Sequence, residues 1–477
     1  MSKIIFIEPK PPGFHIFSKY MSPRLGTFIL GNLMTRRGWD VEVYVEDLAE
    51  IDWERIPEAE IVGISSITST APRAYKIADK IHDMGVPVIM GGPHPTFLTD
   101  ETLEHADYVI RGEGEYSLMK FIDVWETDRN FSNVPALSYK VNGKIIHNPI
   151  SEPAPELDKI PFPDFTLFKG KNKKFMSKGS VIPIQTSRGC PFHCSFCSVT
   201  PMFGKQYRMR SVENIMKELR QYRNRQHSIF FYDDNFAAKP EHTKELLRAM
   251  IDEKLNFKWS AQVRVDVAKD IEMLRLMKKA GCHTVFIGFE SINPKTLEAF
   301  KKSQGVDDII NAIKILRKMH IHIHGMFMLG ADQDNWKTVK KTVQFSRKYR
   351  LTSVQFMIMT PFPGCDLYYS LLNENRILFN DWSLYDAHHV VFKPIQFSVA
   401  QLQKAQIYGH KKFYSWLERF RKLVLGNARG FIINLYAHHL NKIWKKKNRT
   451  YLKVLSLLKA NRYAEVKIDY KEKIYLG

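Results

Sequence analysis

Six strand-and-helix units in the middle of the chain limit its possible folds more than any other feature. Short apolar runs, each bounded by polar turns, predict strands at residues 182–186, 228–232, 258–263, 284–288, 324–329 and 353–359. A helical pattern follows every run except the last, which enters a loop. Parallel strands joined in this way form a complete or partial barrel, whose active site lies at the carboxyl ends of the strands. The sequence therefore predicts an α/β protein with a central (β/α)6 barrel.

The first 130 residues show a second alternation of strands and helices. Apolar runs at residues 4–8, 41–45, 60–66, 86–90 and 108–110 predict the strands of a doubly wound, Rossmann-like domain. Ligands of such folds bind outside the carboxyl ends of the strands, where glycines let the backbone approach closely. Those ends carry Ser65-Ser66, Gly91-Gly92 and Gly112-Glu113.

Two further segments complete the predicted organisation. Residues 131–178 are expected to be a linker that contains one hairpin around Asn142-Gly143, a strong two-residue turn signal. Residues 398–477 form a basic helical region, in which Phe413, Trp416, Leu417 and Phe420 follow helical spacing. The predicted boundaries are therefore 1–130, 131–178, 179–397 and 398–477.

Positive charge is concentrated at the C-terminal end. The 477 residues carry a net charge of +21, and from Val399 onward 18 Lys and Arg stand against 4 Asp and Glu. Such a segment is expected to meet phosphates, including those of anionic lipid headgroups. A helical lid docked on the barrel, with its cations solvated, is the alternative interpretation.

The cysteine content favours a reducing compartment. Three of the five cysteines fall within eight residues, which argues against a disulfide framework. Neither a signal peptide nor an apolar run near the roughly 18 residues of a membrane span is evident. The expected location is the cytoplasm, and a peripheral position on the inner face of the membrane is compatible with it.

The clustered cysteines, Cys190, Cys194 and Cys197, have the spacing C-x3-C-x2-C. Three thiolates on one loop suit a [4Fe-4S] cluster and leave one iron open to another molecule. The alternative is structural zinc with His193 as the fourth ligand, but zinc sites usually have paired C-x2-C units. Because the loop follows the first strand of the barrel, the sequence favours a catalytic cluster.

This loop, with Phe196 before its last cysteine and a six-unit barrel around it, resembles the radical S-adenosylmethionine (radical SAM) superfamily. The resemblance implies that the open iron binds S-adenosylmethionine and that its cleavage gives a 5′-deoxyadenosyl radical. Ordinary polar caps remain the alternative for each residue after the strands. The residues expected to bind this cosubstrate are Phe196, Asp234, Asn235, Gln262, Arg264, Glu290 and Ser291.

The run Pro361-Phe362-Pro363-Gly364 and the preceding Rossmann-like domain resemble the cobalamin-binding branch of that superfamily. The Asp-x-His-x-x-Gly run that gives many cobalamin proteins a cobalt ligand does not occur, since His82 lacks an aspartate two residues earlier. Ser65, Ser66, Thr68 or water is therefore expected at the lower face of the cobalamin. The other residues expected to bind it are Gly91, Gly92, His94, Gly112 and Glu113.

Three residues after the barrel strands are candidate catalytic groups. Cys365 could relay a radical, and His388 or His389 could accept a proton. Packing is the competing interpretation for all three, as it is for Cys282. The run Asp381-Trp382-Ser383-Leu384-Tyr385-Asp386, which is followed by His388-His389, resembles the branch near the anaerobic magnesium-protoporphyrin cyclase and hopanoid-modifying enzymes.

The resemblance implies a methyltransferase that acts on an unactivated carbon of a lipid-like or other small-molecule substrate. An external electron donor, such as flavodoxin or ferredoxin, would reduce the cluster. Radical cyclisation or carbon–carbon coupling without methyl transfer is one alternative, and a zinc-stabilised basic binding protein is another. Nucleic acid is not expected, because the tail lacks the small β-rich barrel that tRNA-modifying members append.

Overall fold

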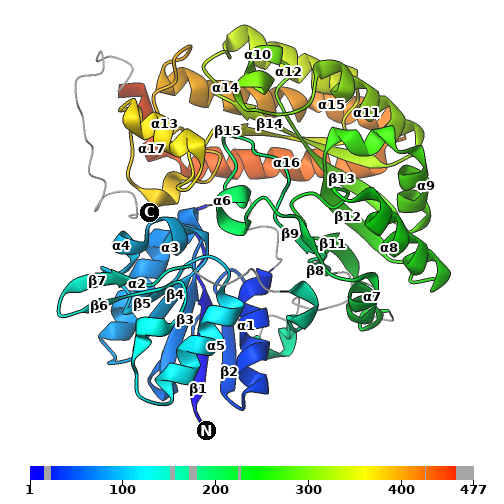
Figure 1. Ribbon diagram of the computed structural model, residues 1–477. Helices are drawn as coiled ribbons and strands as arrows, with labels where there is room; N and C mark the ends of the chain where they lie inside the picture. Colours follow the sequence, from blue (N-terminus) through cyan, green and yellow to red (C-terminus); the bar gives the residue numbers. More distant parts are fainter. Residues whose placement is uncertain (15–22, 151–155, 171–179, 224–226, 425, 458–477) are drawn as a thin grey trace.

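The computed structural model describes residues 1–14, 23–150, 156–170, 180–223, 227–424 and 426–457. It contains two sheets of seven and six strands and a two-stranded ribbon. The first sheet lies in the N-terminal part of the chain, and the six-stranded sheet lies beside it with its own layer of helices (Figure 1).

The N-terminal sheet is covered on both faces. Its parallel strands are β1 (Lys3–Glu8), β2 (Asp40–Val45), β3 (Ile61–Ser65), β4 (Val88–Gly91) and β5 (Tyr108–Ile110). Successive residues of β1 alternate between two cores: Ile4 and Phe6 enter one, and Ile5 and Ile7 the other. Helices α1 (Leu25–Arg36) and α5 (Gly114–Trp125) supply side chains to the first core, and α2 (Ala71–His82) supplies them to the second. This two-sided burial is the doubly wound arrangement expected from the sequence.

The predicted hairpin is present and has a structural role. Its strands, β6 (Leu137–Val141) and β7 (Lys144–His147), are antiparallel, and β6 pairs with β5. The sequence places this hairpin in a linker, but in the structure it extends the N-terminal sheet to seven strands. Their order is β2-β1-β3-β4-β5-β6-β7. Three short elements, α3 (Pro93–Phe97), α4 (Thr99–Thr102) and the 3-10 turn Thr68–Thr70, occupy its loops.

The second sheet confirms the six predicted strands. They are β8 (Val181–Ile184), β11 (Ser228–Phe231), β12 (Lys258–Val263), β13 (Cys282–Glu290), β14 (His322–Leu329) and β15 (Ser353–Ile358). All neighbouring pairs are parallel, and β8 and β15 form the two edges, so the barrel is partial. Pro183 fits the edge strand β8, because proline has no N–H to donate to a neighbouring strand and an edge strand has only one such neighbour.

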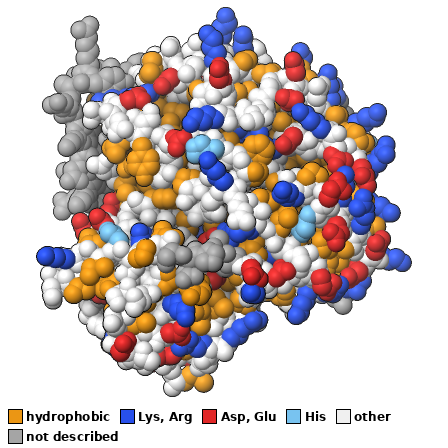
Figure 2. Space-filling view, viewed as in Figure 1, with side chains coloured by type: hydrophobic (Ala, Val, Ile, Leu, Met, Phe, Trp, Pro, Cys, Tyr) orange, Lys and Arg blue, Asp and Glu red, His pale blue; other side chains and the backbone are white. Residues whose placement is uncertain are grey.

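Helices connect these strands. Between β8 and β11 come the short ribbon of β9 (Ser187–Arg188) with β10 (Arg208–Met209) and the helices α6 (Val199–Phe203) and α7 (Val212–Arg220). The later ones are α8 (Pro240–Asp252), α9 (Ile271–Lys279), α10 (Pro294–Ala299), α11 (Val306–Lys318), α12 (Trp336–Lys348) and α13 (Asp366–Asn373). Figure 2 shows acidic and basic side chains mixed over the outer helices on this face. Ion pairs such as Lys244–Asp270, at 2.9 Å, balance charge there.

The described part of the C-terminal region, up to residue 457, forms four helices: α14 (Val399–Phe413), α15 (Trp416–Val424), α16 (Ala428–Lys447) and α17 (Arg449–Leu457). Helix α14 covers the open edge of β15. The Tyr414 hydroxyl accepts from Val354 N at 2.9 Å and donates to Val354 O, while His410 and Gln406 bond to the backbone of Phe356. These bonds pair edge groups that burial would otherwise leave unsatisfied. None of the described helices has the length and apolar character to cross a membrane.

Candidate functional site at the junction of the two sheets

A cavity of about 370 Å³ lies where the carboxyl ends of the two sheets face each other. From the N-terminal sheet it is lined by Ser65, Gly91 and Gly92, and by Gly112 after β5. From the barrel it is lined by Gln185, Asp234 and Gln262, which follow or end β8, β11 and β12. Both folds therefore present their usual ligand-binding edges to one shared space.

The N-terminal side of the cavity is built for close approach of a ligand to the backbone. Gly92 has a φ of +99°, and a Cβ there would lie 2.7 Å from the carbonyl oxygen of Ser66. Gly112 has a φ of +73° and open space where its Cβ would be. The cavity also extends over the sheet between β3 and α1, past Gly63 and Leu30. A large ligand could thus lie on this edge and reach under the helix.

Arg188 joins the two halves of the cavity. It is buried, and it donates from Nη1 to Glu113 at 2.6 Å and from Nη2 to Glu115 at 2.6 Å. Arg208 also pairs with Glu113. Although burial alone would raise the pKa of Glu115, the Arg188 charge holds it below its usual value. The paired strands β9 and β10 therefore attach the start of the cysteine loop to the N-terminal domain.

Cys190, Cys194 and Cys197 follow Arg188 on one partly exposed loop. Burial raises the pKa of Cys190 and, to about 12, that of Cys197, and the charge of Cys194 raises both further. The loop is held from both sides: Ser195 N donates to Phe300 O, and Leu367 N donates to Ser195 O. Among the described residues, no three Cys, His, Asp or Glu side chains are gathered closely enough to hold a single metal ion.

Two adjacent aspartates follow β11 and have different surroundings. Asp233 is buried and accepts bonds from the backbone and hydroxyl groups of Thr186 and Ser187, at 2.6–3.1 Å. Burial nevertheless raises its pKa to about 6. Asp234 faces the cavity, and burial followed by the charge of Asp233 raises its pKa to about 7. Asp234 can therefore carry or release a proton near neutrality, whereas Asp233 fixes the loop.

Of the remaining residues expected at the cosubstrate site, Arg264, Glu290 and Ser291 lie at later strand ends, whereas Asn235 follows Asp234 and Phe196 lies in the cysteine loop. Glu290 has a left-handed φ of 59° and pairs with Lys302 at 3.0 Å, with both side chains buried. The Arg264 guanidinium lies 3.7 Å from the ring centre of Phe192, inside the cysteine loop. Its buried Nε has no hydrogen-bond partner. Phe196 packs against Phe300, while Asn235 and Ser291 are buried.

Some residues expected at the cobalamin site do not line the cavity. His94 is fully buried, and its Nε2 lies 2.8 Å from the Tyr75 hydroxyl, with Trp382 packed near its ring. Ser66 and Thr68 are buried in the turn that follows β3. Ser65 is the cavity-lining member of the three residues expected at the lower face.

The candidate catalytic residues lie in packed surroundings. Cys365 is fully buried, donates to Phe362 O at 3.0 Å, and has a pKa raised by burial to about 11. His389 is held between Asp386 and Asn448, at 2.9 Å from each. His388 lies in the same buried segment, against α14 and α16. None of the three lines the junction cavity.

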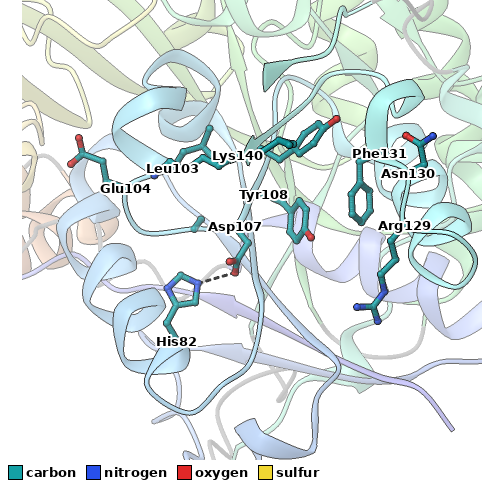
Figure 3. Close-up of a pocket in the computed structure, with 12 residues that line it drawn as sticks. His82, Leu103, Glu104, Asp107, Tyr108, Arg129, Asn130, Phe131 and Lys140 are labelled. Carbon is teal, nitrogen blue, oxygen red and sulfur yellow. Dashed lines mark hydrogen bonds and ion pairs between the residues drawn. The ribbon is translucent and has the colours of Figure 1, made fainter. Parts of the chain in front are cut away.

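His82 lies at the other end of the N-terminal sheet. Figure 3 shows it pointing to Asp107, in a hollow of about 570 Å³ formed near the amino ends of β4 and β5. Its Nε2 is 2.8 Å from the Asp107 carboxylate, and this hydrogen bond raises the pKa of His82. The histidine is therefore placed for an ion pair and not for a ligand at the junction cavity.

Several cavity residues have no motif that marks them. Arg24, Tyr232, Met202 and Phe203 line it, the last two from α6 directly after the cysteine loop. No sequence motif indicates the Arg188–Glu113 pair either, although the sequence identifies the cysteine loop and the Gly112-Glu113 loop as candidate binding sites. Charge complementarity between the segments is the only signal in the sequence that could have found it.

Two family models match the chain. Residues 18–122 match the B12 binding domain, and residues 184–346 match the radical SAM superfamily. An uncharacterized methyltransferase of Pyrococcus horikoshii is 34% identical over 82% of this chain and 88% of its own. The bacteriochlorophyllide d C-12(1)-methyltransferase of Chlorobaculum tepidum is 30% identical over 81% of this chain and 78% of its own. The solved structure of the cobalamin-dependent S-adenosylmethionine radical enzyme OxsB, with aqua-cobalamin and S-adenosylmethionine bound, shares the fold. The TM-score is 0.71 at 16% identity, and the match covers 94% of this chain and 75% of that one.

These matches imply that the protein binds a [4Fe-4S] cluster, S-adenosylmethionine and cobalamin. Three thiols on one loop are the donor set that an iron–sulfur cluster requires. The glycine-lined edge at Gly91, Gly92 and Gly112 gives a large cofactor close access to backbone. The carboxyl group of Asp234, which lines the cavity, and the buried Nε of Arg264, which makes no hydrogen bond and lies 3.8 Å from Asp266, offer polar contacts for a cosubstrate. The residues present therefore fit all three groups, and a zinc-stabilised binding protein is not favoured.

Together, the junction of the two sheets and these matches show that the chain belongs to the radical SAM superfamily, within its cobalamin-dependent methyltransferase family.

Proposed function

We propose that the protein methylates an unactivated carbon of an amphipathic, lipid-like substrate inside the junction cavity. The shared lining of this cavity by the glycine edge of the N-terminal sheet and the strand ends of the barrel carries the proposal. The bacteriochlorophyllide d relative, whose name gives the methylated carbon position C-12(1), supports methylation of carbon. A small external electron carrier and peripheral contact with an anionic membrane are finer parts of the same proposal.

When bound, the three cofactors would supply a carbon-centred radical and the methyl group. The chain would hold them in order. Cys190, Cys194 and Cys197 would ligate the cluster, and Asp234, Gln262, Arg264 and Glu290 would orient S-adenosylmethionine. Gly91, Gly92 and Ser65 would bind cobalamin. Arg188 would hold the N-terminal domain in a fixed position relative to the cysteine loop.

Water exclusion and proton placement are the other tasks of these side chains. The apolar lining from Ile67, Ile89 and Met202 would keep water from a radical. Asp234, with its pKa raised to about 7, could hold or accept a proton beside the reacting groups. His388, His389 and Cys365 would act on substrate only if a different conformation exposed them.

A labelling experiment tests the proposal. Anaerobically reconstituted holoenzyme is incubated with a reductant, S-adenosylmethionine deuterated in its methyl group, and a lipid extract of the source cells. Methylation by this route should give a deuterium-labelled product together with S-adenosylhomocysteine and 5′-deoxyadenosine in equal amounts. Deoxyadenosine with an unlabelled product and no S-adenosylhomocysteine would instead indicate cyclisation or coupling.

A further inference from the structure

Helix α15 carries its apolar side chains on the outside. Trp416, Leu417, Phe420, Leu423 and Val424 are between 53% and 73% exposed. On the opposite face of the same helix, Glu418 and Lys422 are only 6% and 7% exposed. A helix whose outer face meets water has the reverse arrangement. The outer face of α15 is therefore unsuited to water.

Helix α16 extends this feature. It packs against α15 and exposes Ile432, Leu435 and Tyr436, which share one helix face through their i, i+3 and i+4 spacing. We call the exposed apolar residues of these two helices the α15–α16 apolar surface. Large exposed apolar side chains on two helices that pack together are typical of a site of interaction.

A basic cavity lies on the inner side of α15. It has a volume of about 620 Å³ and includes residues just before β14 and β15, at the end of the barrel opposite the cysteine loop. Glu418 is the one acidic residue among those that line it. Its Lys and Arg residues are Lys278, Arg317, Arg347, Arg350, Arg421 and Lys422.

The positive charge of this cavity is poorly balanced. Glu418 pairs with both Arg347, at 2.7 Å, and Arg421, at 3.3 Å. Lys422 donates to the backbone carbonyl of Thr352 and Arg317 to that of Tyr349, so neither meets a carboxylate in these bonds. Burial, followed by the charges of Arg350 and Arg421, lowers the pKa of Arg317. An anion entering the cavity would relieve this repulsion.

We propose that the α15–α16 apolar surface and the basic cavity dock the protein on a bilayer containing anionic phospholipids, with a headgroup phosphate in the cavity. The two features adjoin through α15, as the acyl and phosphate parts of a lipid do. A second copy of the chain would bring a like-charged tail to this surface, whereas an anionic bilayer complements it. This inference rests on the peripheral membrane contact included in the proposed function, and its test does not depend on the proposed methylation reaction.

Vesicle sedimentation tests the inference with the full-length, cluster-loaded protein. Binding is compared between vesicles of phosphatidylcholine alone and vesicles that also contain phosphatidylglycerol, at low and high salt. The variants are Leu417→Ser/Phe420→Ser on the apolar surface and Arg317→Gln/Arg350→Gln in the cavity. The matched controls are Val141→Ser/Ile146→Ser and Lys140→Gln/Lys144→Gln, exposed residues of the β6–β7 hairpin.

The expected result is salt-sensitive binding only to vesicles with phosphatidylglycerol. The cavity variant should bind roughly thirtyfold more weakly, about fivefold for each cation removed, and the controls should bind like the parent protein. The apolar variant should lose binding while its thermal unfolding stays unchanged. Equal binding to neutral vesicles, or full binding by either variant, would overturn the inference. So would a dimer that Phe420→Ser dissociates, since a second copy would then cover the surface.

Discussion

Nη1 of Arg188 lies 2.6 Å from Oε2 of Glu113, and this ion pair joins the entrance of the cysteine loop to the N-terminal sheet. Arg188 makes a second bond of 2.6 Å to Glu115. All three side chains are largely buried, so the pairs are screened less than surface pairs are. The register between the two halves of the cavity depends on them.

Replacing Arg188 with Gln should therefore destabilise the junction strongly. The change leaves two buried carboxylates with less compensation, and we expect a loss of about 3–5 kcal/mol together with weaker cobalamin retention. Thermal unfolding and gel filtration of the loaded protein measure these effects. An Arg220→Gln control, which removes exposed pairs with Glu213 and Glu253, should cost less than about 1 kcal/mol. Equal losses in the two variants would contradict the role given to Arg188.

Gly92→Ala should damage the glycine edge of the cavity. The new Cβ would meet the carbonyl oxygen of Ser66 in a left-handed backbone conformation, so the loop must move. Gly85→Ala is the matched control, because Gly85 has a φ of +75° with open space around it and tests backbone strain alone. We expect about 1 kcal/mol for the control and at least about 1 kcal/mol more for Gly92→Ala, with loss of bound cobalamin. If Gly92→Ala bound as much cobalamin as the parent protein, the placement of cobalamin on this glycine edge would be wrong.

Tyr414→Phe tests how α14 covers the edge of the barrel. The hydroxyl serves both backbone groups of Val354, and its loss leaves them buried without partners. The expected cost is about 2–3 kcal/mol in the free energy of unfolding. The control Tyr408→Phe lies within α14, where the ring packs near Trp336, and should cost under about 0.5 kcal/mol. A similar small cost for Tyr414→Phe would show that water replaces the hydroxyl.

Lys422 gives the stability a defined pH dependence. Burial lowers its pKa from 10.5 to about 8, so between these values the unfolded chain binds more protons than the folded one. The penalty of burying the charge is complete below pH 8 and is relieved as pH rises toward 10.5. From pH 7 to 9.5, the parent protein should gain about 2 kcal/mol relative to Lys422→Met, measured by urea unfolding. A difference independent of pH would mean that Lys422 keeps its ordinary pKa.

Local patterns were sufficient to predict the strands of the two large sheets, but not the short ribbon of β9 and β10. The run predicted at residues 258–263 is β12 itself, and the Asn142-Gly143 turn forms as expected. These features depend on neighbouring residues, which the sequence displays directly. The pairing of β6 with β5 and the Arg188–Glu113 contact join distant segments, and no local pattern records them. The roles of the candidate site residues outside the cavity, such as His94 and His389, stay predictions.

The C-terminal region shows a different limit of sequence patterns. Phe413 and Trp416 share a helical spacing, but the helix breaks between α14 and α15, so Phe413 is buried and Trp416 is 70% exposed. Periodicity identifies which side chains share a face and does not say whether that face meets the core. Periodicity also does not show that α15 lies near the amino ends of the barrel strands. Docking through α15 would anchor the protein there and leave the junction cavity at the opposite end of the strands.

The central claim is that Cys190, Cys194 and Cys197 hold the cluster that cleaves S-adenosylmethionine. The most direct measurement is 5′-deoxyadenosine formation by anaerobically reconstituted parent protein, Cys194→Ala and the control Cys282→Ala, whose buried thiol lies at the start of β13. The account predicts a brown parent and control that both form deoxyadenosine, and no formation by Cys194→Ala. Colourless protein with one bound zinc, or cleavage by Cys194→Ala at the parent rate, would contradict it.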